Sequence, residues 1–163
     1  MAVVYLSLGS NLGNRKEMLS KAIKEIISNG NILIASSSLY ETEPIQIDGF
    51  HEAFYNQVIK IETHKSPLQL LEIIHQIELK QGRIRDGKIS SRTIDIDILF
   101  YDNKITNSEE LKIPHPRLHT RNFVLIPLME IDAYFVHPKF NKTIEELYDE
   151  CKDTSEIIIL DHD

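Results

Sequence analysis

Disulfide bonds are the first thing that this sequence excludes, because Cys151 is its only cysteine. A lone cysteine also excludes a zinc site built from several thiolates. No uninterrupted apolar stretch approaches the roughly 20 residues of a membrane-spanning helix, and no basic segment precedes the first apolar residues, as a secretion signal would require. We therefore expect a cytoplasmic protein with no membrane partner.

Positive charge is also scarce. The 163 residues include 18 Lys and Arg against 25 Asp and Glu, which gives a formal net charge of -7. An acidic surface repels polyanions, so nucleic acid is not an expected partner. The length suits one domain over residues 1–163. We expect a monomer, with a dimer as the alternative.

Apolar runs and helical patterns alternate along the first hundred residues. The capping-box pattern Ser66-Pro67-Leu68-Gln69 starts one of the helices. Gly9–Gly13 lacks the Gly-Lys-Ser/Thr ending of a phosphate loop and predicts a tight strand-to-helix turn. Strands are expected over residues 3–8, 32–40, 54–62 and 94–101, with loops over 41–52 and 83–92. Helices are expected to bury Met18, Leu19, Ala22, Ile23, Ile26 and Ile27, and Leu68, Leu71, Ile74 and Ile77.

The resulting order, β-α-β-β-α-β, is typical of an α+β sandwich of the ferredoxin-like kind. In such a fold an antiparallel sheet carries its helices on one face. Residues after about 101 predict a less regular C-terminal extension.

Two aspartates on the strand over residues 94–101 carry the clearest chemical signal. Because side chains alternate across a strand, Asp95 and Asp97 share one face, about 6–7 Å apart at Cα, while Ile94, Ile96, Ile98 and Phe100 share the other. Paired carboxylates suit Mg²⁺, which completes its shell with water and phosphate oxygens. The alternative is an amphipathic strand with a solvated acidic face, and the strand alone does not decide between them.

Arginines gather around this strand. Five of the six in the chain fall between residues 83 and 121. Guanidinium groups offer paired donors to phosphate oxygens, so the cluster favours a metal-bound polyphosphate over ordinary surface ion pairs. The five are Arg83, Arg85, Arg92, Arg117 and Arg121.

His115 stands between two prolines, which restrict the backbone on both sides of it. A histidine held in this way could donate a hydrogen bond to a phosphate, although an isolated turn histidine with no role fits the same pattern. None of the other histidines shows metal-ligand spacing.

These segments together resemble 6-hydroxymethyl-7,8-dihydropterin pyrophosphokinases, a family of the folate pathway. The matching blocks run in order from residue 5 to about 130, and the Arg92–Leu99 and Pro114–Arg117 blocks are specific in combination. The blocks are Tyr5–Gly13, Tyr40–Pro44, Phe54–Asn56, Ile77–Arg85, Arg92–Leu99, Pro114–Arg117 and Arg121–Leu125.

The resemblance implies transfer of the β,γ-diphosphate of ATP to the pterin hydroxymethyl group, with release of AMP and two Mg²⁺ ions on Asp95 and Asp97. ATP and the reduced pterin would be the small-molecule partners. Catalysis would involve Arg83, Arg85, Arg92 and Asp97. ATP would be bound by Glu78, Arg83, Arg85, Arg92, Ile98, His115 and Arg121. The pterin would be bound by Thr42, Pro44, Ile45, Phe54, Asn56, Asp95 and Phe123.

General chemistry agrees with the pterin assignment. A flat pterin can lie between two aromatic faces, such as Phe54 and Phe123, and its amide-like edge matches the donors and acceptors of Asn56. One departure concerns the loop before the aspartate strand. The family usually reads Arg-Trp-Gly-Pro-Arg there, whereas this chain reads Lys88-Ile89-Ser90-Ser91-Arg92 and has no tryptophan.

Two other functions fit parts of the pattern. A different two-metal enzyme, such as a nucleotidyl transferase or cyclase, would use Asp95 and Asp97 without binding a pterin. A non-catalytic ligand-binding or RNA-binding module of ferredoxin-like type would bind without metal, although no RNP-like strand is present and the net charge opposes RNA.

Overall fold

The structure, a computed structural model, describes residues 1–42, 53–82 and 94–160. Its centre is an antiparallel six-stranded sheet in the order β5-β1-β4-β3-β8, with β2 also paired to β4. The predicted α+β class with an antiparallel sheet is therefore correct. The principal elements are β1 (Ala2–Ser10), α1 (Arg15–Ser28), β2 (Ile32–Ser36), β3 (Tyr40–Thr42), β4 (Phe54–Thr63), α2 (Pro67–Lys80), β5 (Asp95–Tyr101), α3 (Asn122–Asp132), α4 (Ile144–Glu150) and β8 (Ile157–Ile159).

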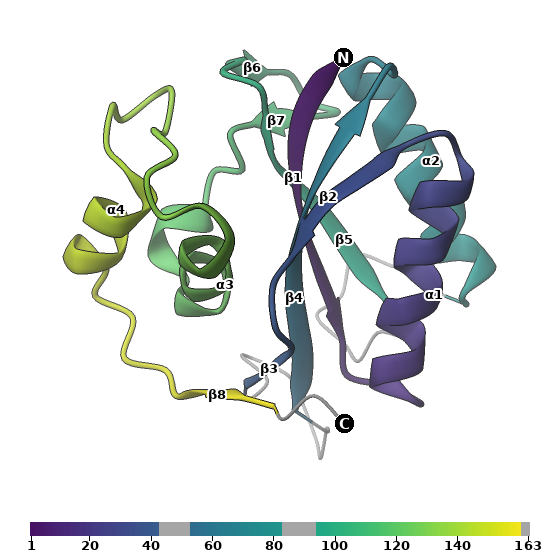
Figure 1. The fold of residues 1–163 in the computed structure, drawn as a ribbon, viewed down its shortest axis with the longest axis horizontal. Coiled ribbons are helices and arrows are strands. Elements are labelled where there is room, and N and C mark those ends of the chain that lie inside the picture. The colour runs from purple at the N-terminus through teal and green to yellow at the C-terminus, as the bar shows by residue number, and fades with distance from the viewer. Residues whose placement is uncertain (43–52, 83–93, 161–163) are drawn as a thin grey trace.

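Helices cover both faces of this sheet, not one. Figure 1 shows α1 and α2 on one side and α3 and α4 on the other. The expectation of helices on a single face holds for α1 and α2 only, because the C-terminal part of the chain folds back over the second face. A small hairpin of β6 (Thr106–Asn107) and β7 (Lys112–Ile113) and a 3-10 turn, η1 (Leu118–Thr120), link β5 to α3.

The first two helices carry local capping signals at their ends. The Asn14 side chain accepts a hydrogen bond from the backbone N–H of Glu17. Helix α1 ends at Ser28, and its C-cap Asn29 is followed by Gly30, whose φ is +85°. The predicted capping box of Ser66 and Gln69 is present at the start of α2. Side-chain caps satisfy backbone donors that a helix end leaves without partners.

The buried stripe of α2 differs from the predicted one. Leu70, Ile74 and Ile77 are buried, whereas Leu68 is 53% exposed. Leu68 precedes Leu70 by two residues and so lies about 200° around the helix from it. The polar Glu78 takes the next core position and is fully buried, so hydrophobicity alone misplaced the stripe. In α1 the predicted core residue Ile27 is likewise 41% exposed.

An extra residue in β5 reverses its side-chain alternation. Tyr5 pairs with Phe100 but Leu6 pairs with Ile98, so Leu99 has no partner in β1. Such a bulge moves the following side chain to the opposite face. Ile94, Ile96 and Ile98 accordingly pack in the aliphatic core under α1 and α2, as predicted. Phe100 does not share their face and packs instead against Tyr5 and Phe135, with ring centroids 5.8 and 4.7 Å away.

The strand expected over residues 32–40 is interrupted. Strands β2 and β3 both pair with β4, but the chain between them leaves the regular ladder at Ser37, whose Oγ accepts the backbone N–H of Val58 at 2.9 Å. Glu41 and Thr42, expected in a loop, belong to β3. The rest of that predicted loop lies outside the described residues.

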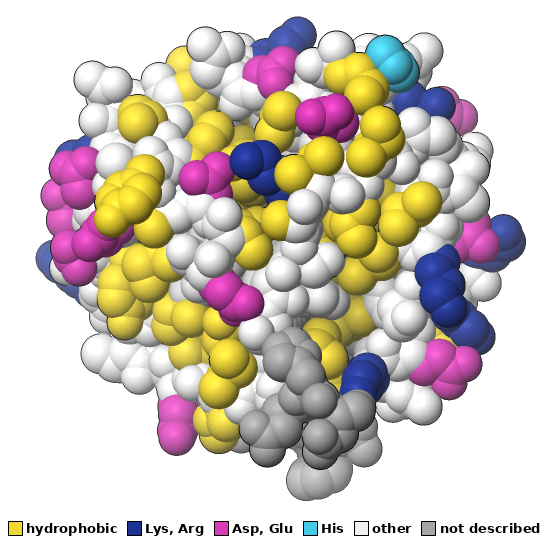
Figure 2. All heavy atoms as spheres, in the orientation of Figure 1, with side chains coloured by type: hydrophobic (Ala, Val, Ile, Leu, Met, Phe, Trp, Pro, Cys, Tyr) yellow, Lys and Arg dark blue, Asp and Glu magenta, His cyan; other side chains and the backbone are white. Residues whose placement is uncertain are grey.

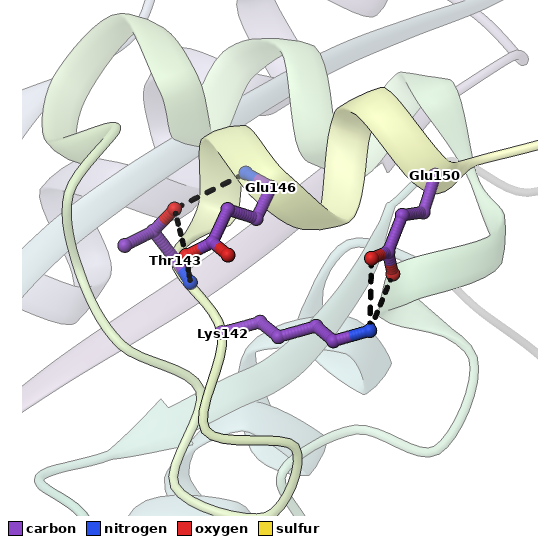
Figure 3. Close-up of polar contacts among 4 residues, drawn as sticks. All are labelled: Lys142, Thr143, Glu146 and Glu150. Carbon is purple, nitrogen blue, oxygen red and sulfur yellow. Dashed lines mark hydrogen bonds and ion pairs between the residues drawn. The ribbon is translucent and has the colours of Figure 1, made fainter.

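The C-terminal extension is more regular than predicted. Strand β8 adds to the edge of the sheet by pairing with β3, and α4 packs against α3. Figure 3 shows how α4 is fixed: Thr143 and Glu146 form a capping box, and Lys142 Nζ lies 2.7 Å from a carboxylate oxygen of Glu150. Capping residues can be recognised from the local sequence, whereas the pairing of β8 depends on β3, which is distant in the sequence.

Within the described residues, no helix combines the length and apolarity that crossing a bilayer would require. Figure 2 shows hydrophobic side chains interspersed with acidic and basic ones over the face that carries β2, α3 and α4. Exposed aliphatic residues on the edge strands include Ile32, Ile34, Ile158 and Ile159.

Candidate functional site

A row of residues crosses four neighbouring strands near one end of the sheet. In register, Asp95 of β5 lies beside Gly9 of β1, Gly9 lies beside Asn56 of β4, and Asn56 lies beside Tyr40 of β3. Directly paired residues point to the same face of a sheet, here the face that α3 covers. The row therefore joins the predicted metal ligands to the predicted pterin residues.

Asp95 and Asp97 lie on this face as predicted. Both are half-buried, and Asp97 pairs across the strands with Ser7. Within the described residues no group of three or more His, Cys, Asp or Glu side chains forms a ready-made metal cage. Two carboxylates on a rigid strand nevertheless fit Mg²⁺, which takes one or two protein carboxylates and obtains its other oxygens from water and phosphate.

Glu78 supports this strand from the opposite face. Its carboxylate is fully buried and accepts the backbone N–H of Ile96 at 3.0 Å. A carboxylate in this position satisfies a backbone donor between the two aspartates. Glu78 thus helps to fix the part of β5 that carries them, and its contact with ATP stays a prediction.

Ile98 was also expected to contact ATP. Its side chain is 4% exposed and packs in the aliphatic core, on the face opposite Asp95 and Asp97. The side chain therefore does not line the face that holds the aspartates.

His115 is held beside the strand and is mostly buried. Its backbone N–H donates to the carbonyl of Leu99, and its Nδ1 accepts the backbone N–H of Arg117 at 3.1 Å. The pKa of His115 is lowered to about 4, mainly by burial and then by the charges of Arg121 and Arg117, while Asp95 acts in the opposite direction. The imidazole is neutral at pH 7, and because Nδ1 is an acceptor, Nε2 carries the proton.

The start of α3 brings a cation and an aromatic ring to the same region. Arg121 occupies the N-cap position of α3, and its guanidinium lies 5.5 Å from the ring centroid of Phe123. The backbone and side-chain nitrogens of Asn122 both donate to Asp153, at 2.9 and 2.6 Å. These bonds anchor this end of α3 to the chain that follows α4.

The predicted pterin residues on β3 and β4 form a polar pair beside an aromatic ring. Asn56 is 4% exposed, and its Nδ2 donates to Thr42 Oγ1 at 2.8 Å. Phe54 is half-buried and pairs across the strands with Thr42. The structure thus brings Thr42, Phe54 and Asn56 together on the face that carries Asp95.

Several predicted residues lie outside the described part of the chain. These are Arg83, Arg85, Arg92, Pro44 and Ile45. Their roles stay predictions.

Residues that the motif search did not assign complete the site. Gly9 stands between Asp95 and Asn56, and a Cβ there would come within 3.2 Å of Asn56 Oδ1, so the position favours glycine through a close approach. Tyr40 and Glu130 contact each other behind the Asn56–Thr42 pair. The Tyr40–Pro44 block contained Tyr40, but nothing in the sequence pointed to Glu130.

A cavity of about 260 Å³ lies next to His115, between the β6–β7 hairpin and the loop after α3. Lys112 and Lys139 contribute positive charge to its lining, which also includes His119 and the buried His137. The pKa of His137 is lowered to about 4, mainly by burial and then by His119 and Lys139.

The described part of the chain is an α+β fold whose candidate site lies on the face of the sheet that α3 covers. A family model described as 7,8-dihydro-6-hydroxymethylpterin-pyrophosphokinase (HPPK) matches residues 5–133. The chain belongs to this family, whose named members are enzymes.

Curated relatives agree with the family. The chain is 41% identical over 154 residues to a 2-amino-4-hydroxy-6-hydroxymethyldihydropteridine pyrophosphokinase of Haemophilus influenzae, with 94% of this chain and 95% of the relative covered. It is 42% identical over 160 residues to the folic acid synthesis protein fol1 of Pneumocystis carinii. That match covers 98% of this chain but only 20% of the relative, so the chain spans about a fifth of that longer protein.

Solved structures of low sequence identity share the fold. A crystal structure of wild-type Plasmodium falciparum HPPK-DHPS superposes with a TM-score of 0.70 at 19% identity, covering 91% of this chain and 44% of that one.

Proposed function

We propose that the chain transfers the pyrophosphoryl group of ATP to the hydroxymethyl group of 6-hydroxymethyl-7,8-dihydropterin, releasing AMP, in folate biosynthesis. The observation that carries the proposal is the row from Asp95 through Gly9 to Asn56, which puts two candidate metal ligands and a hydrogen-bonding pair for a pterin on one face of the sheet. The activity in the names of the relatives agrees with it.

Asp95 and Asp97 would hold two Mg²⁺ ions, which would neutralise phosphate charge and orient the reacting oxygens. The neutral His115 would donate from Nε2 to a phosphate oxygen, and Arg121 would add a charge-assisted hydrogen bond. Arg83, Arg85 and Arg92 would complete the phosphate contacts.

The pterin would lie between Phe54 and Phe123, with its amide-like edge against Asn56 and Thr42, and with Pro44, Ile45 and Asp95 also in its pocket. Aromatic faces on both sides favour a flat ring. The oxygen of the hydroxymethyl group would attack the β-phosphorus of ATP in line with the leaving oxygen, forming an O–P bond. The bond from that phosphorus to the α,β-bridging oxygen would break, AMP would leave, and the hydroxyl proton would go to Asp97.

The finer structural assignments belong to the same proposal. If β2 and β3 are counted as one interrupted strand, the order β5-β1-β4-β2/β3 corresponds to 4-1-3-2 along the chain. We therefore assign the first part of the chain to the ferredoxin-like arrangement, within one domain over residues 1–163. A cytoplasmic, monomeric enzyme stays the prediction.

Product analysis tests the reaction. Phosphorus NMR of a mixture of protein, ATP, Mg²⁺ and the reduced pterin should show AMP and a pterin diphosphate in equal amounts, and chelation of Mg²⁺ should stop their formation. Formation of ADP would contradict pyrophosphoryl transfer. Nucleotide turnover that continues without the pterin would instead favour a nucleotidyl transferase or cyclase, and pterin affinity without turnover or metal dependence would favour a binding module.

A further inference from the structure

We propose that Glu130, near the C-terminal end of α3, is a positioning residue that sets the geometry of the pterin pocket through Tyr40 and Ser38. The role rests on the proposed function, because it assumes that the Asn56–Thr42 pair contacts the pterin. In the described part of the chain its hydrogen bonds go to Tyr40 and Ser38, neither of which is a predicted substrate residue.

The Glu130 carboxylate makes an unusually complete set of contacts with the chain between β2 and β3. One oxygen, Oε1, accepts from the hydroxyl of Tyr40 at 2.5 Å. The other, Oε2, accepts from the backbone N–H and from Oγ of Ser38, both at 2.9 Å. Hydrogen bonds to a charged acceptor are stronger than neutral ones, so this carboxylate is a firm attachment point for the segment.

The attachment falls where the regular ladder of the sheet is interrupted. Between β2 and β3 the regular ladder is interrupted, and the Ser37 side chain replaces a backbone acceptor for Val58. The backbone N–H of Ser38 therefore uses Glu130 as its acceptor. Because a buried backbone donor needs a partner, this carboxylate is one of the groups that fix the chain at the entry into β3.

Tyr40 connects Glu130 to the Asn56–Thr42 pair of the proposed pterin pocket. It is 6% exposed, pairs across the strands with Asn56, and lies two residues before Thr42 on the same face of β3. Thr42 Oγ1 in turn accepts from Asn56 Nδ2. A shift of β3 that follows loss of the Tyr40–Glu130 bond would thus change the orientation of the Asn56 amide, which Gly9 approaches closely on its other side.

Helix α3 connects the two sides of the proposed pterin pocket. The same helix carries Phe123 in its first turn and Glu130 near its end. The Glu130 contacts therefore fix the helix that carries Phe123 relative to the strands that carry Asn56 and Thr42. Glu130 is an exposed residue, so its substitution leaves the apolar core in place.

Asp132 supplies a matched control on the same helix. Its carboxylate also accepts from a tyrosine hydroxyl, that of Tyr5, and from Lys60 Nζ at 3.3 Å. Tyr5 and Lys60 pair with each other four residues along β1 from Gly9, away from the pocket row. Loss of either carboxylate removes a bond from α3 to a tyrosine hydroxyl of the sheet, but Tyr40 belongs to β3 whereas Tyr5 belongs to β1.

The test compares Glu130→Gln, Tyr40→Phe, their double variant and Asp132→Asn in the full chain. Equilibrium binding of 6-hydroxymethyl-7,8-dihydropterin in the presence of Mg²⁺ and a non-hydrolysable ATP analogue is measured with the steady-state KM for each substrate. We expect Glu130→Gln and Tyr40→Phe each to weaken pterin binding about three- to tenfold. The KM for ATP and the effect of Asp132→Asn on pterin binding should both stay within about twofold of wild type.

The double variant should lose little more than either single variant, because both remove the same bond. Equal losses for ATP and the pterin, or a pterin loss in Asp132→Asn as large as in Glu130→Gln, would overturn the positioning role. Wild-type protein that binds the pterin without forming AMP would overturn the proposed reaction while the binding comparison still decides the role of Glu130. Wild-type protein that does not bind the pterin would overturn both.

Discussion

The two faces of the sheet differ in how completely apolar side chains cover them. Under α1 and α2 lies an aliphatic core that includes Leu6, Ile61 and Ile74, all fully buried. Under α3 and α4 a second apolar cluster surrounds the rings of Tyr5 and Phe100, and most of its other buried members are aliphatic. At one end of that second face lie the polar Asp95–Gly9–Asn56 row and its neighbours.

This difference separates stability from function within one sheet. The first face is closed and apolar, so its side chains stabilise the fold through burial. The polar end of the second face leaves Asp95 and Asp97 half-buried, where they add little apolar burial but are placed to bind charged ligands. Substitutions on the two faces should therefore have opposite signatures.

The largest effect on function is expected at the aspartates. Asp95→Asn and Asp97→Asn each remove a negative charge that a metal needs while keeping the side-chain shape. We expect AMP formation to fall at least about a hundredfold, as for the loss of other groups that stabilise charge in a transition state. Thermal unfolding should stay close to that of the wild type, and near-normal turnover in both variants would contradict a metal site on β5.

A substitution on the first face is expected to lower stability without lowering activity. Ile74→Ala creates a cavity in the aliphatic core and should lower the free energy of unfolding by about 2–5 kcal/mol. Denaturant titration measures this loss. The kcat of the folded fraction should be unchanged; a large fall in kcat at full folding would show that the two faces are not separable.

A smaller effect is expected from the histidines on the second face. The folded-state pKa values of His115 and His137 are lowered to about 4, mainly by burial. A lowered histidine pKa contributes stability that is present above the unfolded value of about 6.5 and is lost as the pH falls towards 4. Each histidine should contribute on the order of 2 kcal/mol to the free energy of unfolding at pH 7.

Urea titrations between pH 7 and 4 measure this dependence. His137→Asn keeps an acceptor near the position of Nδ1 and removes the titration, so it should flatten part of the pH profile. An unchanged profile would show that His137 protonates equally easily in the folded and unfolded chain.

The smallest effect is expected at Gly9. A Cβ there would lie 3.2 Å from Asn56 Oδ1 and 3.7 Å from Cδ1 of Phe54. Gly9→Ala should therefore displace the Asn56 amide and raise the KM for the pterin a few-fold, corresponding to about 1 kcal/mol, while the KM for ATP changes less. Equal changes in both values would place Gly9 in general support of the sheet.

Local signals in the sequence predicted much of the first face. The capping box at Ser66 and the alternation of Ile94, Ile96 and Ile98 depend on neighbouring residues, and both are present. The bulge at Leu99 was missed because only the register against β1 reveals it. The addition of β8 and the covering of the second face by α3 were missed because both depend on contacts between distant segments.

The candidate site shows the same division. The motifs predicted Asp95, Asn56 and Thr42, and the structure places them on one face. Glu130 is separated from Tyr40 by 90 residues, and no local pattern relates a helical glutamate to a distant strand. The burial of Glu78 was likewise not predicted, because a charged residue in a helical sequence is normally assigned to the exposed face.

The most direct test of the whole account is to locate bound substrates by NMR. Isotope-labelled protein is titrated with Mg²⁺, a non-hydrolysable ATP analogue and then the reduced pterin, and amide shifts are followed residue by residue. The account predicts that the pterin step shifts Gly9, Thr42, Asn56 and Phe123 and leaves α1 and α2 nearly unchanged. Shifts concentrated on α1 and α2, with none along the Asp95–Gly9–Asn56 row, would contradict it.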